Sequence, residues 1–104
     1  MFKKVLATSL FVLISSTAFA AEVEVGQKNK QFTKKVVTIK SGDSVKFTNQ
    51  DPFFHNVFSL SDLKTFDLGS YPKGQSKSVR FEAKGTYDIE CAIHPNMQMK
   101  VIVE

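Results

Sequence analysis

The stretch YDIECAIHPNMQMKVIVE, residues 87–104, contains two alternating segments joined by a short loop. Each segment places its apolar side chains on one face: Tyr87, Ile89 and Cys91 in the first, and Met99, Val101 and Val103 in the second. A period of two is typical of β-strands with one buried face. The stretch therefore predicts two strands, with the histidine and a methionine in the loop that joins them.

The same alternation recurs at close spacing in the rest of the chain. It predicts strands within residues 21–25, 30–40, 44–49, 55–60 and 77–83, separated by turns such as Ser41-Gly42-Asp43. Residues 61–76 are polar and contain glycine and proline, so we expect a long connection there that holds at most one helical turn. Many short strands predict an all-β antiparallel sandwich or barrel, built as a single domain over residues 21–104.

The N-terminus has the features of a secretion signal. Lys3 and Lys4 precede an apolar run over residues 5–14, and Ala18-Phe19-Ala20 fits a cleavage site with small residues at the required positions. The apolar run is shorter than the roughly 20 residues that a transmembrane helix needs. We expect residues 1–20 to be a cleaved signal peptide, and residues 21–104 to be a periplasmic protein without a membrane anchor.

Charge and cysteine content narrow the functional classes. Removal of Lys3 and Lys4 lowers the formal net charge from +4 to +2, which is too weak and too dispersed to favour nucleic acid as a partner. The chain has a single cysteine, so no disulfide can form within it. The cysteine can therefore be a metal ligand, form a bridge between two chains or remain a free thiol. We expect the protein to be a monomer.

Four residues form a candidate metal site: His55, Cys91, His94 and a methionine at position 97 or 99. Cys91 ends a predicted strand, and His94 and Met97 follow it at intervals of three, so one loop can direct three ligands to one point. His55 lies thirty-six positions earlier, also near a strand end, and strand ends meet at the poles of a sandwich. Two imidazoles, one thiolate and a weak axial thioether are the ligands of a blue-copper electron-transfer site.

Two segments resemble the cupredoxins, the family of type 1 blue copper proteins, and are closest to its amicyanin-like and plastocyanin-like members. They are VVTIKSGDSVKFTNQDPFFHNVFSL, residues 36–60, and FEAKGTYDIECAIHPNMQMKVIVE, residues 81–104. The resemblance implies a Greek-key β-sandwich with one copper ion at one end, held by His55, Cys91 and His94. It also implies that the backbone N–H of Asn56 bonds the Cys91 sulfur.

The axial ligand has two candidates. The spacing Cys-x2-His-x2-Met is amicyanin-like and selects Met97, whereas Cys-x2-His-x4-Met is plastocyanin-like and selects Met99. In both groups of relatives a lysine lies three positions after the ligand and opens a valine-rich strand, and here Lys100 lies three positions after Met97. Met99 shares the strand face of the following valines. We therefore expect Met97 to be the ligand.

These features predict a soluble one-electron carrier that cycles copper between Cu(I) and Cu(II). Its redox partners would be proteins such as a dehydrogenase, a cytochrome c or an oxidase, docked on an apolar rim that includes Pro52, Phe53 and Pro95. The alternative is a periplasmic copper-binding or delivery protein without obligatory electron transfer. Catalysis is not expected, because a nucleophilic Cys–His pair lacks a third orienting residue here.

Overall fold

The structure, a computed structural model, describes residues 20–104, so the predicted signal peptide lies outside the described residues except for Ala20. The described residues form nine strands and no helix. The strands are β1 (Glu22–Lys28), β2 (Gln31–Phe32), β3 (Val36–Ile39), β4 (Ser44–Asn49), β5 (His55–Ser61), β6 (Lys64–Tyr71), β7 (Ser76–Arg80), β8 (Gly85–Glu90) and β9 (Gln98–Val103). Within residues 20–104, no helix is long and apolar enough to cross a membrane.

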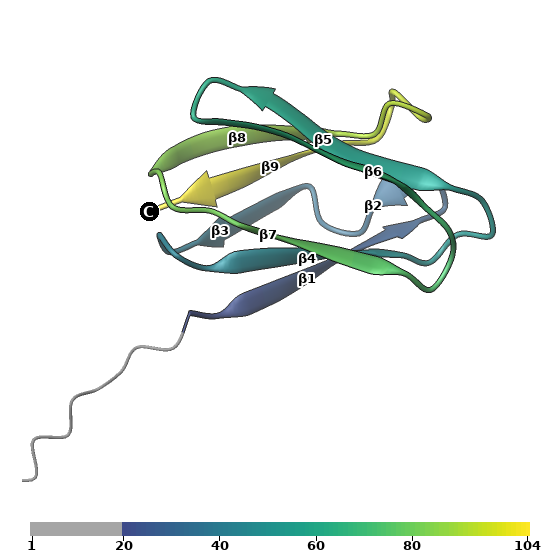
Figure 1. Cartoon of the computed structure of the whole chain (residues 1–104), viewed down its shortest axis with the longest axis horizontal. Coiled ribbons are helices and arrows are strands. Elements are labelled where there is room, and N and C mark those ends of the chain that lie inside the picture. Colours follow the sequence, from purple (N-terminus) through teal and green to yellow (C-terminus); the bar gives the residue numbers. More distant parts are fainter. Residues whose placement is uncertain (1–19) are drawn as a thin grey trace, which may run out of the picture.

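The strands form two sheets that pack face to face (Figure 1). The first sheet has the order β2-β1-β4-β7, and the second has the order β3-β9-β8-β5-β6. The two strands of the opening stretch, β8 and β9, pair antiparallel in the middle of the second sheet, with Tyr87 opposite Val101 and Ile89 opposite Met99. The expected Greek-key β-sandwich is confirmed, because the strand order in both sheets is non-sequential and the chain passes repeatedly between them.

The inward faces of the two sheets form one apolar core. Aromatic rings pack edge-to-face within it: Phe32 against Phe47 with centroids 6.2 Å apart, and Phe81 against Tyr87 with centroids 4.9 Å apart. Cys91, Met97 and Met99 belong to the same buried cluster. The end of the core therefore continues directly into the candidate metal site, and its packing restrains the residues there.

Two strand pairs differ from the antiparallel arrangement that the sequence predicted. β1 pairs with β4, and β3 pairs with β9, both in parallel. Between β1 and β4 the chain visits the opposite sheet through β3 and returns to its starting end, which makes a parallel neighbour possible. Alternation identifies the buried face of a strand but carries no information about the direction of its neighbour.

The connection expected over residues 61–76 was wrong, because half of it, Lys64–Tyr71, is the strand β6. β6 pairs with β5 along its length and forms the edge of the second sheet. Its side chains are only partly covered: Phe66 and Leu68 are half-buried, and Tyr71 is buried. Since the backbone bonds to β5 define this strand more than apolar periodicity does, the sequence pattern was too weak to predict it.

The core position of Phe81 generates a stability prediction. Its ring is fully buried and contacts both Tyr87 and Phe66. Replacement by alanine would leave a cavity, so we expect Phe81→Ala to lower the free energy of unfolding by about 3–5 kcal/mol in urea denaturation of the metal-free protein. Leu60→Ala is the control, because this leucine is 71% exposed, and it should change stability by less than about 0.5 kcal/mol. Equal effects of the two substitutions would contradict the described core.

Candidate metal centre

The candidate ligands meet at one end of the sandwich because of how β5 and β8 pair. His55 is the first residue of β5, and Cys91 follows directly after the last residue of β8. The two strands are antiparallel, with Phe58 opposite Glu90. The beginning of β5 and the end of β8 therefore lie at the same end of the second sheet, where the loop between β8 and β9 projects (Figure 1).

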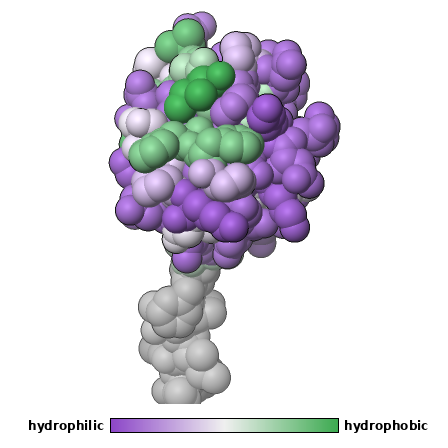
Figure 2. Space-filling view, turned by 90° about the vertical axis from the view of Figure 1, so that its right-hand side faces the viewer, coloured by the Kyte–Doolittle hydropathy of each residue, from purple (hydrophilic) through white to green (hydrophobic). Residues whose placement is uncertain are grey.

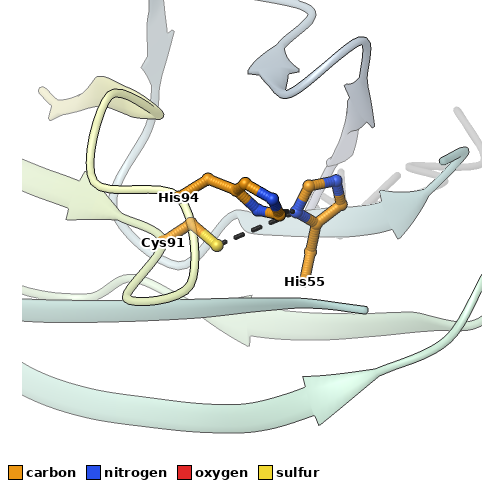
Figure 3. Close-up of side chains that lie close together, drawn as sticks. All are labelled: His55, Cys91 and His94. Atoms are coloured by element: carbon orange, nitrogen blue, oxygen red, sulfur yellow. Dashed lines mark hydrogen bonds between the residues drawn. The ribbon is translucent and has the colours of Figure 1, made fainter. Parts of the chain in front are cut away.

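Three of the predicted ligands lie close together (Figure 3). The Nδ1 atom of His55 is 3.8 Å from the Cys91 sulfur and 3.2 Å from Nδ1 of His94. One ligand atom from each residue fits within 4.8 Å of the others. His55 and Cys91 are buried, whereas His94 is half-buried. Two residues thirty-six positions apart and a loop histidine thus converge on one point.

The spacing of these atoms fits a single bound metal ion. Bonds of about 2.0–2.3 Å to nitrogen and sulfur place two ligand atoms of one ion roughly 3–4 Å apart. The 3.2 Å and 3.8 Å separations around His55 Nδ1 meet this requirement. Two imidazole nitrogens and a thiol, with oxygen ligands absent from the group, also suit copper better than magnesium or calcium.

The loop from Cys91 to Met97 is closed by its own backbone. The N–H of Cys91 donates to the carbonyl of Met97 at 3.2 Å, and the N–H of Met97 donates to the carbonyl of His94 at 2.8 Å. Met97 is buried and precedes β9, so it belongs to the same closed loop as Cys91 and His94. Met99 is also buried, but it lies within β9 opposite Ile89. This difference in position favours Met97 as the fourth ligand.

Asn56 links β5 to this loop, but by a different bond from the one expected. Its side-chain oxygen accepts a hydrogen bond from the backbone N–H of Ala92 at 2.6 Å. The expected bond from its backbone N–H to the Cys91 sulfur is not among the hydrogen bonds of the described residues. The backbone carbonyl of Asn56 accepts from the Gln27 side chain, which in turn accepts from the Tyr71 hydroxyl. A buried network of hydrogen bonds therefore restrains Asn56, the residue next to His55.

Phe53 packs against both histidines. Its ring centroid lies 5.2 Å from that of His55 and 5.2 Å from that of His94, while the two imidazoles are 4.9 Å apart.

Burial lowers the pKa of His94 below its ordinary value, and the nearby His55 and Lys30 add to this shift. This shift favours the neutral imidazole, the form whose nitrogen can bind a metal.

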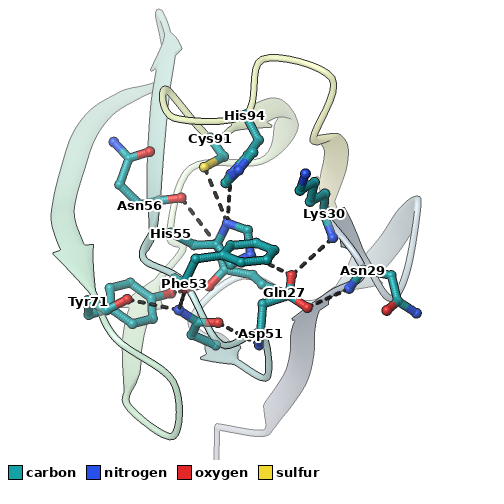
Figure 4. A network of polar contacts seen from close by, with 11 residues as sticks. Gln27, Asn29, Lys30, Asp51, Phe53, His55, Asn56, Tyr71, Cys91 and His94 are labelled. Carbon is teal, nitrogen blue, oxygen red and sulfur yellow. Dashed lines mark hydrogen bonds and ion pairs between the residues drawn. The ribbon is translucent and has the colours of Figure 1, made fainter.

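Sequence reasoning missed Asp51, which contacts the other nitrogen of His55 (Figure 4). The expectation that the pair of Cys91 and His55 lacks a third orienting residue was therefore wrong. The carboxylate lies 2.7 Å from Nε2 of His55 and also accepts the backbone N–H groups of Asn29 and Lys30. Burial raises the pKa of this carboxyl, but the hydrogen bonds from Lys30, His55 and Asn29 outweigh burial and hold the pKa below its usual value. The available signal was a carboxylate four residues before a candidate ligand.

Comparison with known proteins assigns the family. The profile described as "Copper binding proteins, plastocyanin/azurin family" matches residues 19–104. The chain belongs to this family. Amicyanin-alpha of Methylorubrum extorquens is 38% identical over 88 residues, covering 82% of this chain and 74% of that protein. A chloroplastic plastocyanin of Physcomitrium patens is 34% identical over 112 residues, covering 97% and 67% of the two chains.

Solved structures of the family have the same fold as this chain. A Cu(I) form of an amicyanin variant superposes with a TM-score of 0.75 at 28% identity, covering 80% of this chain and 82% of that one. A copper-containing nitrite reductase from Thermus scotoductus superposes with a TM-score of 0.74 at 26% identity, but the match covers only 22% of the enzyme. The predicted cupredoxin membership and the copper cofactor are confirmed.

The bond from Asn56 to the loop generates a prediction about metal retention. Asn56→Ala removes the acceptor for the Ala92 N–H and frees the loop from β5. We expect the affinity for copper to fall about 10–100-fold, as is typical when groups that support ligands are removed. Competition with a Cu(I) chelator measures this effect.

Asn96→Ala is the matched control, since this asparagine lies in the same loop but is exposed. It should retain copper as the unaltered protein does. Equal losses in the two variants would mean that loop composition, and not the bond to β5, determines metal retention.

Proposed function

We propose that the chain holds one type 1 copper ion through His55, Cys91, His94 and Met97 and serves as a one-electron carrier. The observation that carries this proposal is the convergence of two imidazole nitrogens and one thiol sulfur at the end of a packed sandwich. Copper, when bound, supplies the reversible exchange of one electron between Cu(I) and Cu(II). The family assignment and the amicyanin, plastocyanin and pseudoazurin relatives support the same function.

The proposed ligands differ in which oxidation state of copper they favour. The Cys91 thiolate and the Met97 thioether are soft ligands that favour Cu(I), whereas the imidazoles of His55 and His94 accept both oxidation states. Three of these four side chains are buried, and the hydrogen bonds of the loop restrain the fourth. A set of ligands that suits neither state fully, and that packing prevents from rearranging, favours fast electron transfer.

His94 is the proposed point of electron entry and exit. It is the one half-buried member of the ligand set, and its neighbour Ile93 is 48% exposed. Phe54, from the connection before β5, is 53% exposed. Figure 2 shows an apolar patch on this end of the molecule, surrounded by hydrophilic residues. Such a small apolar surface suits brief docking of a redox protein.

The residues expected to form the apolar rim differ in exposure. Phe53 is half-buried and packs against both histidines, and Pro52 and Pro95 are exposed. We propose that a dehydrogenase, a cytochrome c or an oxidase docks on this end of a monomeric protein. We also propose that residues 1–20 direct residues 21–104 to the periplasm.

Burial of the ligands argues against the delivery alternative, since exchange of copper between proteins needs an open site. Catalysis is not part of the proposal. The matched family is described as copper-binding, and the nitrite reductase match covers only 22% of that enzyme.

The copper–thiolate bond provides the first test. Cu(II) added to the metal-free protein should produce an intense visible band that bleaches on reduction and returns on oxidation. We expect Cys91→Ser to abolish this band, because no other thiol is present in the chain. Met99→Leu is the control and should retain the band with a similar potential, whereas Met97→Leu should change the potential. A normal band in Cys91→Ser would refute the site, and a shift confined to Met99→Leu would reassign the axial ligand.

The apolar end provides a second test that needs no identified partner. Electron self-exchange between two copies, measured by NMR line broadening in mixed oxidation states, requires two such ends to meet. Ile93→Lys places a charge there and should slow self-exchange by roughly tenfold or more. Leu60→Lys adds the same charge at an exposed position on β5, five residues and roughly 16 Å along the strand from His55. This control should have little effect, and equal slowing would place the electron port elsewhere.

A further inference from the structure

Asp51 occupies an unusual environment for a carboxylate. It is only 4% exposed, yet it has no lysine or arginine side chain as an ion-pair partner among the described residues. Its Oδ1 accepts the N–H of Asn29 at 2.7 Å, and its Oδ2 accepts the N–H of Lys30 at 3.0 Å and meets His55 Nε2 at 2.7 Å (Figure 4). Two backbone N–H groups and one imidazole nitrogen thus surround one buried carboxylate, and the imidazole belongs to a proposed metal ligand.

Two of these donors come from a hairpin turn in the opposite sheet. β1 and β2 pair antiparallel, with Lys28 opposite Gln31, so Asn29 and Lys30 form a two-residue turn. Both have positive φ angles, 55° and 56°, as a type I′ turn requires. Asparagine tolerates this conformation well, but lysine rarely adopts it. The turn therefore directs two successive N–H groups at Asp51 at a conformational cost to Lys30.

Further contacts offset this cost. The Lys30 side chain lies over the ring of Phe53, with Nζ 5.5 Å from the ring centroid. That ring packs against both His55 and His94. The same turn thus reaches the candidate site twice, once through its backbone and once through a side chain. It connects the first sheet to a site built mainly from the second.

The carboxylate determines which nitrogen of His55 carries the proton. The Asp51 carboxyl oxygens already accept two backbone N–H groups, so the geometry assigns Nε2 of His55 as the nitrogen that donates to Asp51. The Nδ1 lone pair is then free and faces the Cys91 sulfur at 3.8 Å and His94 Nδ1 at 3.2 Å. A carboxylate bonded to the far nitrogen also makes a ligating imidazole more electron-donating. The negative charge should favour a divalent ion over a monovalent one.

We propose that Asp51, held by the Asn29–Lys30 turn, is a positioning residue that fixes the tautomer of His55 and increases the preference of the site for divalent ions. This inference rests on the proposed function, since it takes His55 as a metal ligand. It assigns the β1–β2 turn a role at the metal centre, although the turn is far from the proposed ligands in the sequence.

Asp51→Asn removes the charge while keeping the shape of the side chain. An amide can place its oxygen toward His55 and Lys30, but its NH2 group then faces the N–H of Asn29. The matched control is Asp43→Asn. Asp43 likewise accepts two backbone N–H groups, from Ala21 at 2.9 Å and Lys40 at 3.0 Å, but it lies in the turn before β4 and contacts no histidine.

Zn(II) and Cu(I) are the probes, because neither depends on the visible band. In Asp51→Asn we expect the dissociation constant for Zn(II) to rise about 10–100-fold, and that for Cu(I) to rise less. The reduction potential of the copper protein should therefore shift upward. Asp43→Asn should match the unaltered protein in all three measurements. Equal weakening of Zn(II) and Cu(I) in Asp51→Asn, or no difference from Asp43→Asn, would overturn the proposal.

A measurement on the unaltered protein covers the case in which Asp51→Asn does not fold. Nitrogen-15 NMR of the metal-free protein should find the His55 proton on Nε2 and an unprotonated Nδ1. A proton on Nδ1 would overturn the proposal. These results are separable from the proposed function: a normal blue band with the wrong tautomer would remove only the role of Asp51, whereas absence of the band would remove the carrier function itself.

Discussion

The antiparallel pairing of β5 with β8 is the constraint on which the metal end of the molecule depends. It brings the first residue of β5, His55, and the residue that follows β8, Cys91, to the same end of the second sheet. A slip of one residue in this register would turn the His55 side chain to the other face of the sheet. The bond from the Ala92 N–H to the Asn56 side chain extends the same pairing beyond the end of β8. The metal site therefore forms only if β5 and β8 pair in this register.

Supports from both sheets then restrict the ligands. In the second sheet, the backbone bonds between Cys91, His94 and Met97 close the loop. From the first sheet, the β1–β2 turn holds Asp51, which in turn contacts His55. We infer that the packing of the sandwich positions the proposed ligands before a metal binds. Binding of copper would then require little movement of these residues. The same rigidity would let copper change its oxidation state without rearrangement of its ligands.

The sequence predicted the sandwich, and the three residues that converge at its end, better than the strand connections or the supporting residues. His55, Cys91 and His94 could be found because their residue types and spacing are chemically distinctive. β6 was missed because an edge strand buries little and alternates weakly, and the parallel pairs leave no mark on periodicity. Asp51 and the Asn29–Lys30 turn could not be connected, since Lys30 and Asp51 are twenty-one positions apart and only the folded chain brings their polar groups together.

The central claim is that the fold positions the ligands before copper binds. Crystal structures of the metal-free and the copper-loaded protein test it most directly. The account predicts that the ligand atoms of His55, Cys91 and His94 lie within ~0.5 Å of the same positions in both structures, with Met97 completing the site. A metal-free structure in which the His55 ring is rotated away from Asp51, or a loaded structure in which copper lies outside this group, would contradict it.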